Sequence, residues 1–547
     1  MNLPSTPSYP IGGSTPRKST EEIDNLAKMN VEERDEIRQR QGYKKILNTC
    51  EEAQRDRYEW VWVDTCCIDK RSSAELSEAI NSMYRWYENS RVCYAYLHDV
   101  QGRFILTKND DAYPKSNGWP EWFSRGWTLQ EMIAPSNLQF FNKDWQAIGD
   151  KKTLAHTLTC ITEIPQHILK EGLFGNRPCV AQIISWAARR TTTRVEDRAY
   201  SLMGLLDVNM PMLYGEGKKA FHRLQLEIIR SSNDQSIFAW GHDSDVRIGS
   251  ILADDPTFFG SCSGMELMDH DEFLDSLKTR ISAEELASID QDRFGAFPIT
   301  NRGIHIWMFL RRYHKSNTLF KAYLPCRNKL GTVTITLALW DSNYYRHSGA
   351  FSATESHGDA LQFRQVYLRY QDMSCSVTFE IDDGEITEDF TCSDTRENTF
   401  ILTDSNPLCV KIYTAKRSTV RFAVAFGQYF GLDWVYFLNN APLLRRRRVQ
   451  YSTLQKGELM FRGLDLAQSM ADVPSRDDCR RRLWIHYLSV STWIVRISRL
   501  VWERSMVGVR IEAFRHPGFQ CGLDWKTFDI KVSINVLILH MNYHDYL

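Results

Sequence analysis

Apolar side chains recur at helical intervals after a polar stretch that ends near residue 73. The intervals are three or four residues, which places these side chains on one face of a helix. That face is formed by Leu76, Ile80, Met83, Tyr84 and Tyr87. Ser72 and Glu75 have the spacing of a capping box, in which side-chain oxygens accept hydrogen bonds from free N–H groups at a helix start. The pattern therefore predicts an amphipathic helix that begins just after Ser72.

Short runs of apolar and aromatic residues alternate with helical segments in the first part of the chain. Their length and their β-branched or aromatic content are typical of buried strands. The runs lie at 58–64, 92–97 and 137–141. Helix-forming residues fill 31–55, and another helix is expected from Ser124 to Ala134, where Pro135 stops it. Because strand and helix alternate, the pattern predicts an α/β fold with a parallel sheet.

The pattern changes further along the chain. A mainly helical stretch follows the α/β part, and short β-type runs separated by turn residues begin near residue 290. The first residues are rich in Pro, Ser, Thr and Gly, which predicts a disordered tail. The expected parts are a tail at 1–30, an α/β domain at 31–150, a helical extension at 151–241, a linker at 242–290, a β-rich domain at 291–440 and a basic region of unknown fold at 441–547.

The charge balance excludes strong global attraction to nucleic acid. The chain has 67 Lys and Arg against 68 Asp and Glu, a net charge of −1, so no single-sign field draws in a polynucleotide. The run RRRR at 445–448 is expected to be a solvated basic face. No apolar run reaches the ~18 residues of a spanning helix, and no signal-peptide pattern opens the chain. A cytoplasmic protein without a membrane span is therefore expected.

The 13 cysteines show neither a disulfide framework nor the C-x-x-C spacing of a zinc site. We accordingly expect no metal. Cys66 and Cys67 lie next to an apolar run, which predicts buried, reduced thiols.

A glycine motif competes for a nucleotide-binding role. Residues 215–220, GEGKKA, fit the G-x-G-x-x-A pattern of dinucleotide-binding folds and precede a good helix. The segment before them contains Pro211, which a central strand disfavours. The motif is therefore interpreted as an ordinary helix N-terminal turn.

Three long segments together resemble the HET (heterokaryon incompatibility) family of fungi. They are YEWVWVDTCCIDKRSSAELSEAINSMYRWYENSRVCYAYLHDV at 58–100, SRGWTLQEMIAPSNLQFF at 124–141 and SWAARRTTTRVEDRAYSLMGLLDVNMPMLYGEGKKAF at 185–221. The resemblance implies a role in fungal non-self recognition and programmed cell death, with protein partners in incompatibility signalling. It is also compatible with a homo-oligomer. It also implies a fold distantly related to TIR domains, a TIR/flavodoxin-like parallel sheet followed by a helical subdomain and a β-rich C-terminal region.

The TIR relationship gives the chain a candidate chemistry. Some TIR domains cleave NAD with a glutamate in a pattern like S-x-W-C-x-x-E, and the segment from Ser124 to Glu131 resembles it in the spacing of Trp127 and Glu131. Glu131 is thus the candidate catalytic residue, NAD the candidate substrate, and no cofactor is implied. A carboxylate suits this reaction because positive charge develops on the ribose as nicotinamide leaves. The alternative is that Glu131 is an ordinary solvent-facing helix residue.

Asp64, Asp69 and Trp127 are candidate substrate-binding residues. The two aspartates lie at and beyond the end of the strand at 58–64, and open α/β sheets bind ligands at the carboxyl ends of strands. Asp64 has an equally common alternative role in shaping the turn after the strand. For Trp127 the alternative is a place in the core.

One departure from the family pattern bears on catalysis. Members of the family open with a strand and loop resembling Y-A-I-L-S-H-x-W, and nothing of that kind is recognisable before residue 40. The sheet is therefore expected to lack its central first strand. A second hypothesis follows, that the chain is a catalytically inactive HET-domain protein with an interaction or regulatory role.

Overall fold

The structure is a computed structural model, and its described residues fall into two compact units. The first comprises Met1–Asp245, Ser250–Ala350 and Thr354–Gln371, and the second Val246–Gly249, Phe351–Ala353 and Asp372–Leu547. The residues that it describes are 8–9, 30–102, 108–114, 116–173, 175, 177–241, 247–281, 297–313, 319–340, 342–348, 360–371, 377–382, 390–392, 399–402, 408–416, 421–429, 432–439, 485–490, 493–503 and 506–515.

The first unit opens with a five-stranded sheet in the order β2-β1-β3-β4-β5. Strands β1 to β4 run parallel, and β5 is antiparallel to β4. The strands are β1 (Ser8–Tyr9), β2 (Trp62–Val63), β3 (Cys93–Tyr96), β4 (Leu138–Phe141) and β5 (Ala147–Asp150). The expected α/β fold with a parallel sheet is confirmed at this level.

The expectation that the first strand is missing is wrong. Ser8 pairs with Trp62 of β2 and with Cys93 of β3, so β1 lies between these strands. The sequence pattern failed here because the strand has only two residues and stands between Pro7 and Pro10, whereas strand recognition rests on longer runs and counts proline against a central strand. Of the tail predicted at 1–30, only this strand and Asn30 belong to the described residues.

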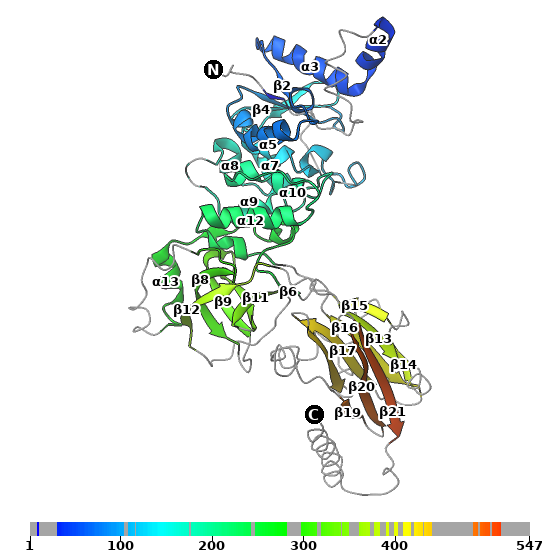
Figure 1. The fold of residues 1–547 in the computed structure, drawn as a ribbon. Coiled ribbons are helices and arrows are strands. Elements are labelled where there is room, and N and C mark those ends of the chain that lie inside the picture. Colours follow the sequence, from blue (N-terminus) through cyan, green and yellow to red (C-terminus); the bar gives the residue numbers. More distant parts are fainter. Residues whose placement is uncertain are drawn as a thin grey trace. The chain divides into compact units, whose positions relative to one another are not determined.

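Helices surround the sheet (Figure 1). They are α2 (Val31–Gln39), α3 (Gln41–Arg55), α4 (Asp64–Cys67), α5 (Ser73–Glu88), η1 (Glu121–Ser124) and α6 (Thr128–Ile133). The helix expected from Ser124 begins only at Thr128, and the stretch at 31–55 forms two helices. The capping prediction is confirmed, because the Ser72 hydroxyl accepts from the Glu75 N–H at 3.2 Å. In a capping box the Glu75 carboxylate would accept from the backbone N–H of Ser72. Here it accepts from the Asp69 N–H instead, at 2.8 Å.

Helix α5 buries its predicted face together with the central strands. Tyr87 and the residues of β3 join one apolar core with α6 and β4, and this core continues into the helical part. That part contains α7 (Ala155–Thr162), α8 (Gln166–Glu171), α9 (Val180–Ser185), α10 (Asp197–Tyr200), α11 (Met203–Leu206), α12 (Lys219–Ser231) and η2 (Gln235–Phe238). Among the described residues no helix is both long and apolar enough to cross a membrane.

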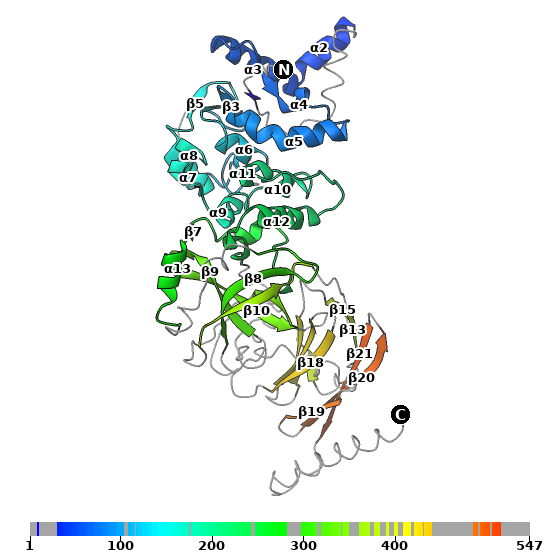
Figure 2. The ribbon, with the colours of Figure 1, turned by 60° about the vertical axis from the view of Figure 1, so that its left-hand side comes forward.

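The β-rich part of the first unit forms a ring of strands. β10 pairs with both β9 and β11, and the chain of pairings continues through β12 and β8 back to β9. Helix α13 lies beside β9 (Figure 2). The elements are η3 (Pro256–Phe259), β7 (Glu266–Leu267), α13 (His270–Leu277), β8 (Ile304–Arg312), β9 (Leu319–Asn328), β10 (Gly331–Trp340), β11 (Asn343–Ser348) and β12 (Gln362–Leu368).

The second unit is built from two sheets. Their orders are β15-β13-β21-β20-β19 and β14-β16-β17-β18. The strands of these two sheets are β13 (Val377–Asp382), β14 (Phe390–Cys392), β15 (Thr399–Leu402), β16 (Leu408–Ala415), β17 (Arg421–Tyr429), β18 (Leu432–Asn439), β19 (Ile485–Val490), β20 (Trp493–Glu503) and β21 (Met506–Arg515), and β6 (Arg247–Gly249) belongs to neither sheet. The expected β-rich C-terminal region is thereby confirmed, and the arginine run at 445–448 lies outside the described residues.

A close approach between α11 and α5 gives a test of the packing that holds α5. A Cβ added to Gly204 would lie 2.2 Å from the Tyr84 Cβ, an atom that cannot move without its backbone. We therefore expect Gly204→Ala to destabilise the first unit by about 1–3 kcal/mol, the usual cost of overpacking. Urea unfolding followed by tryptophan fluorescence measures this loss. The matched control is Gly264→Ala, whose added Cβ meets no atom within 4 Å; equal stability of the two variants would contradict the close contact.

Candidate functional site

Polar side chains from several elements meet at the carboxyl edge of the parallel strands. Asp64 follows directly after β2, and His98 stands two residues after β3. These strands are the two neighbours of β1, so the loops that follow them flank the centre of the sheet. In open α/β sheets, ligands bind at such an edge, where the strand order reverses.

Glu131 faces inward from α6. Its side chain is buried, with 6% of the residue exposed, so the solvent-facing alternative is excluded. The Tyr87 hydroxyl donates to Glu131 Oε1 at 3.4 Å, and Oε2 has no hydrogen-bond partner among the described residues. Burial, and next the charge of Asp64, raise the pKa of Glu131 to about 8. The carboxyl group is therefore mainly protonated at neutral pH.

Asp64 is the second carboxyl group of the site, and the residue is half-buried. Its Oδ1 is buried without a hydrogen-bond partner in the described part of the chain. Burial raises the pKa of Asp64, and the charges of Lys70 and Arg125 oppose this rise. The charge of Asp64 in turn raises the pKa of Glu131, so the two carboxyl groups titrate as a coupled pair.

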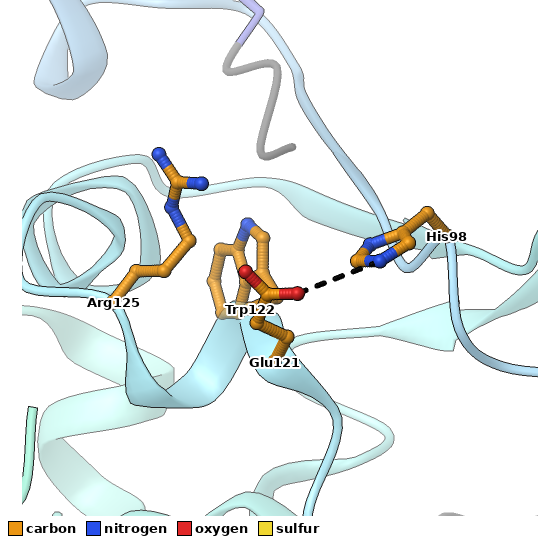
Figure 3. Close-up of a pocket in the computed structure, with 4 residues that line it drawn as sticks. All are labelled: His98, Glu121, Trp122 and Arg125. Atoms are coloured by element: carbon orange, nitrogen blue, oxygen red, sulfur yellow. Dashed lines mark ion pairs between the residues drawn. The ribbon is translucent and has the colours of Figure 1, made fainter. Parts of the chain in front are cut away.

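A shallow hollow lies beside this pair of carboxyl groups. It is lined by His98, Glu121, Trp122 and Arg125 (Figure 3). His98 Nε2 lies 3.6 Å from Glu121 Oε2, and Arg125 extends on the other side of Trp122. Trp122, which lines the hollow, also acts on Glu131 and lowers its pKa, so this ring connects the hollow with the buried acid.

Lys45 adds a second cation next to Arg125. It projects from α3 and is only 9% exposed, with Nζ 5.1 Å from the centre of the Tyr96 ring. Burial lowers the pKa of Lys45, the charge of Arg125 lowers it further, and Glu121 opposes them. Two cations held together at the carboxyl edge of a sheet form an arrangement that an anion stabilises.

Arg190 fixes the segment that carries Arg125 and the start of α6. Its guanidinium donates to the Arg125 carbonyl at 2.8 Å and to the Thr128 hydroxyl at 2.9 Å. The side chain is buried, and burial lowers the pKa of Arg190 to about 9. Arg190 is therefore a positioning residue for Arg125.

The structure brings Glu131 and Asp64 together and places the other two predicted residues elsewhere. The Asp69 carboxylate is occupied by Arg71, whose Nε and Nη2 each donate at 2.8 Å, and these bonds lower its pKa to about 2. Trp127 is half-buried against the core, and its side chain bonds to Asp197. Sequence reasoning missed the other members of the site, and only the basic character of Lys45 and Arg125 could have indicated them. These missed residues are Lys45, Tyr87, His98, Glu121, Trp122, Arg125 and Arg190.

In the glycine motif at 215–220, the backbone N–H groups that could bind an anion already donate hydrogen bonds to a carboxylate of this chain. The N–H groups of Gly215 and Gly217 donate to the same oxygen of Glu196, at 2.8 and 2.9 Å. These bonds lower the pKa of Glu196, so the carboxylate is stably charged. In a dinucleotide fold a phosphate would take this place. The interpretation of this segment as a turn before α12 fits the structure.

Comparison with known proteins confirms the family resemblance. Residues 6–119 match the family described as heterokaryon incompatibility protein (HET), and residues 219–248 match a domain of unknown function, DUF8212. The vegetative incompatibility protein HET-E-1 of Podospora anserina is 44% identical over 188 residues. That match covers 34% of this chain and 14% of the relative, so this chain corresponds to a small part of it.

A solved structure of the Xerocomus chrysenteron lectin XCL was also matched. It is 12% identical and covers 26% of this chain and 99% of the lectin, with a TM-score of 0.18. A similarity at this level carries no argument about the fold or the function of the chain.

Proposed function

We propose that this chain, whose N-terminal part is a HET domain, is a cytoplasmic incompatibility protein that acts in non-self recognition and causes cell death by cleaving NAD. The matched family and the relative named a vegetative incompatibility protein support the first part of the proposal. The second part depends on one observation: Asp64, at the carboxyl edge of a parallel sheet, lies close enough to the buried Glu131 for its charge to raise the pKa of Glu131. Protein partners of the incompatibility response, including further copies of this chain, would supply the activating signal.

The strand order supports a distant relationship to TIR and flavodoxin-like folds. Flavodoxin-like sheets have the order 2-1-3-4-5 and bind their ligands beside strands 1 and 3. The same order occurs here, with the difference that β5 is antiparallel. The presence of β1 removes the main objection to an active site, because the centre of the sheet is complete.

The two carboxyl groups divide the chemistry between them. Asp64, when ionised, supplies a negative charge that stabilises the positive ribose of the transition state. Glu131, protonated in the free protein, loses its proton more readily when the cationic nicotinamide ribose lies beside it. As the bond between ribose C1′ and the nicotinamide nitrogen breaks, its electrons go to nicotinamide. Water then attacks C1′ and gives a proton to the Glu131 carboxylate.

The cations at the hollow suit the diphosphate of the same substrate. Lys45 and Arg125 would each face a phosphate while the ribose reaches Glu131 past Trp122. Because a charge-assisted hydrogen bond contributes ~1.5–3 kcal/mol, we expect Arg125→Met to weaken the binding of ADP-ribose about 10-fold to 100-fold. Isothermal titration calorimetry measures the change. Arg189→Met is the control, because Arg189 is exposed and pairs only with Glu163 at the surface; equal loss in both variants would contradict the assignment.

Incubation of the purified chain with NAD tests the proposed activity. Release of nicotinamide and ADP-ribose in a 1:1 ratio, followed by chromatography at several protein concentrations, supports it. Expression in cells should lower the NAD level before viability falls. An unchanged NAD level at every expression level at which cells die would contradict NAD cleavage as the cause of death.

A second candidate function is a catalytically inactive protein that works by interaction or regulation. Two observations favour it: the deep burial of Glu131, and the shallowness of the hollow, which encloses almost no volume. Ligand pockets typically enclose ~300–1,000 Å³, so a nucleotide would be only partly enclosed in this conformation. Binding of a protein partner without any NAD turnover distinguishes this function from the first.

A further inference from the structure

Helix α4 presents two neighbouring thiols at the end of β2. The Val63 N–H donates to Cys67 Sγ at 3.4 Å, and the Cys66 thiol donates to the Val63 carbonyl at 3.6 Å. Cys67 is exposed and Cys66 is half-buried. The expectation that both thiols are buried is therefore wrong for Cys67, because the short helix turns it outward after the buried end of β2.

A third thiol approaches from α3. Cys50 and Ala53 are one turn apart on this helix and so lie on the same side of it. Ala53 belongs to a small buried cluster with Val63, and Cys66 packs against the same cluster. Cys50 is half-buried, and its thiol is near enough to Cys67 for their charges to interact. Three reduced cysteines, Cys50 on α3 and Cys66 and Cys67 on α4, thus lie near one another.

We propose that Cys67, with Cys50 as its partner, forms a peroxide-sensitive modification site at the edge of the HET domain. Exposure gives an oxidant access to Cys67, and the backbone N–H of Val63 stabilises its thiolate. The neighbouring Cys66 side chain and the Val63 N–H lower the pKa of Cys67, whereas burial raises that of Cys50. The thiolate is the reactive form, so Cys67 reacts first.

The oxidation takes place in two steps that each balance. The Cys67 thiolate attacks one oxygen of a hydroperoxide, the O–O bond breaks, and with one proton the other oxygen leaves as water or an alcohol. Sulfur is oxidised by two electrons to a sulfenic acid, and the peroxide is reduced. The Cys50 thiol then attacks the Cys67 sulfur, and the hydroxyl group leaves as water with the Cys50 proton. The product is a disulfide between α3 and α4.

Cys66 is a poor disulfide partner for Cys67 for geometric reasons. Consecutive Cα atoms are ~3.8 Å apart, whereas disulfides usually join Cα atoms at ~4.4–6.8 Å. A bond between Cys66 and Cys67 would therefore distort the turn of α4. Asp64 is the first residue of the same helix, so a disulfide here would also change the surroundings of the candidate site.

Thiol labelling of the full-length reduced protein tests the first step. Iodoacetamide at pH 7 should modify Cys67 at least ~10-fold faster than Cys160, an exposed cysteine on α7 in the same molecule. Peptide mass spectrometry measures both rates in the unaltered chain, so no variant needs to fold. Labelling of Cys67 no faster than Cys160 would overturn the proposal.

Hydrogen peroxide tests the second step. Stoichiometric peroxide should yield a peptide pair joined between Cys50 and Cys67, and Cys50→Ser should instead trap a dimedone adduct on Cys67. Cys160→Ser, the matched control, should still form the disulfide. Oxidation that reaches Cys160 first, or that joins Cys67 to another chain, would contradict the assignment. Neither readout depends on NAD turnover, so the thiol site and the proposed enzyme function can fail separately.

Discussion

Glu131→Gln is expected to lower the rate of nicotinamide release from NAD by at least ~100-fold, the loss typical for removal of one electrostatic group from an active site. Glutamine has nearly the same shape and can accept the hydrogen bond that Tyr87 donates to Oε1 at 3.4 Å. What it cannot do is become an anion or take up the proton of the attacking water. The effect should therefore appear in kcat more than in KM.

A chromatographic assay of nicotinamide at matched protein concentrations measures this loss. The control is Glu78→Gln on the exposed side of α5 in the same domain, which should keep the rate of the unaltered chain. Circular dichroism should show the same fold for both variants. If Glu131→Gln retains more than about a tenth of the activity, Glu131 is not the group that accepts the proton of the attacking water.

The sequence pattern predicted the elements that are long and regular. Helix α5, with its apolar face and its Ser72 cap, and strands β3 and β4 were all visible as runs with a clear period. Strand β1 was not, because its place in the sheet is decided by pairing with β2 and β3 and not by its own two residues. Such tertiary effects override local pattern most easily where an element is short.

The candidate site was predictable only in part. Glu131 came from the family resemblance and Asp64 from its place after a strand, and the charge of Asp64 acts on the buried Glu131. Asp69 had the same kind of support as Asp64, yet it is bound by Arg71 two residues away. Arg125 and Lys45 are 80 residues apart (125 − 45), so no local pattern could join them. Their meeting depends on how α3 packs over the sheet edge.

Glu131 should also make the stability of the first unit fall as pH rises. Its pKa is about 8 in the folded protein, above the usual value of 4.5. Between these values the unfolded chain releases the proton and the folded protein keeps it, so the stability that the protonated group provides is complete below pH 4.5 and is lost as pH rises to 8. At ~1.4 kcal/mol for each pKa unit, the total loss has an upper bound of about 5 kcal/mol.

The difference in unfolding free energy between the unaltered chain and Glu131→Gln isolates this effect, because other titrating groups contribute equally to both. Urea unfolding at several pH values should show that the variant gains stability relative to the unaltered chain from about pH 5 to 8, with no further gain above pH 8. Parallel pH curves would contradict the raised pKa. A carboxyl group kept only for structure would not impose such a cost at neutral pH, whereas an active-site acid does so routinely. Loss of activity together with a gain in stability in the same variant would therefore identify Glu131 as functional.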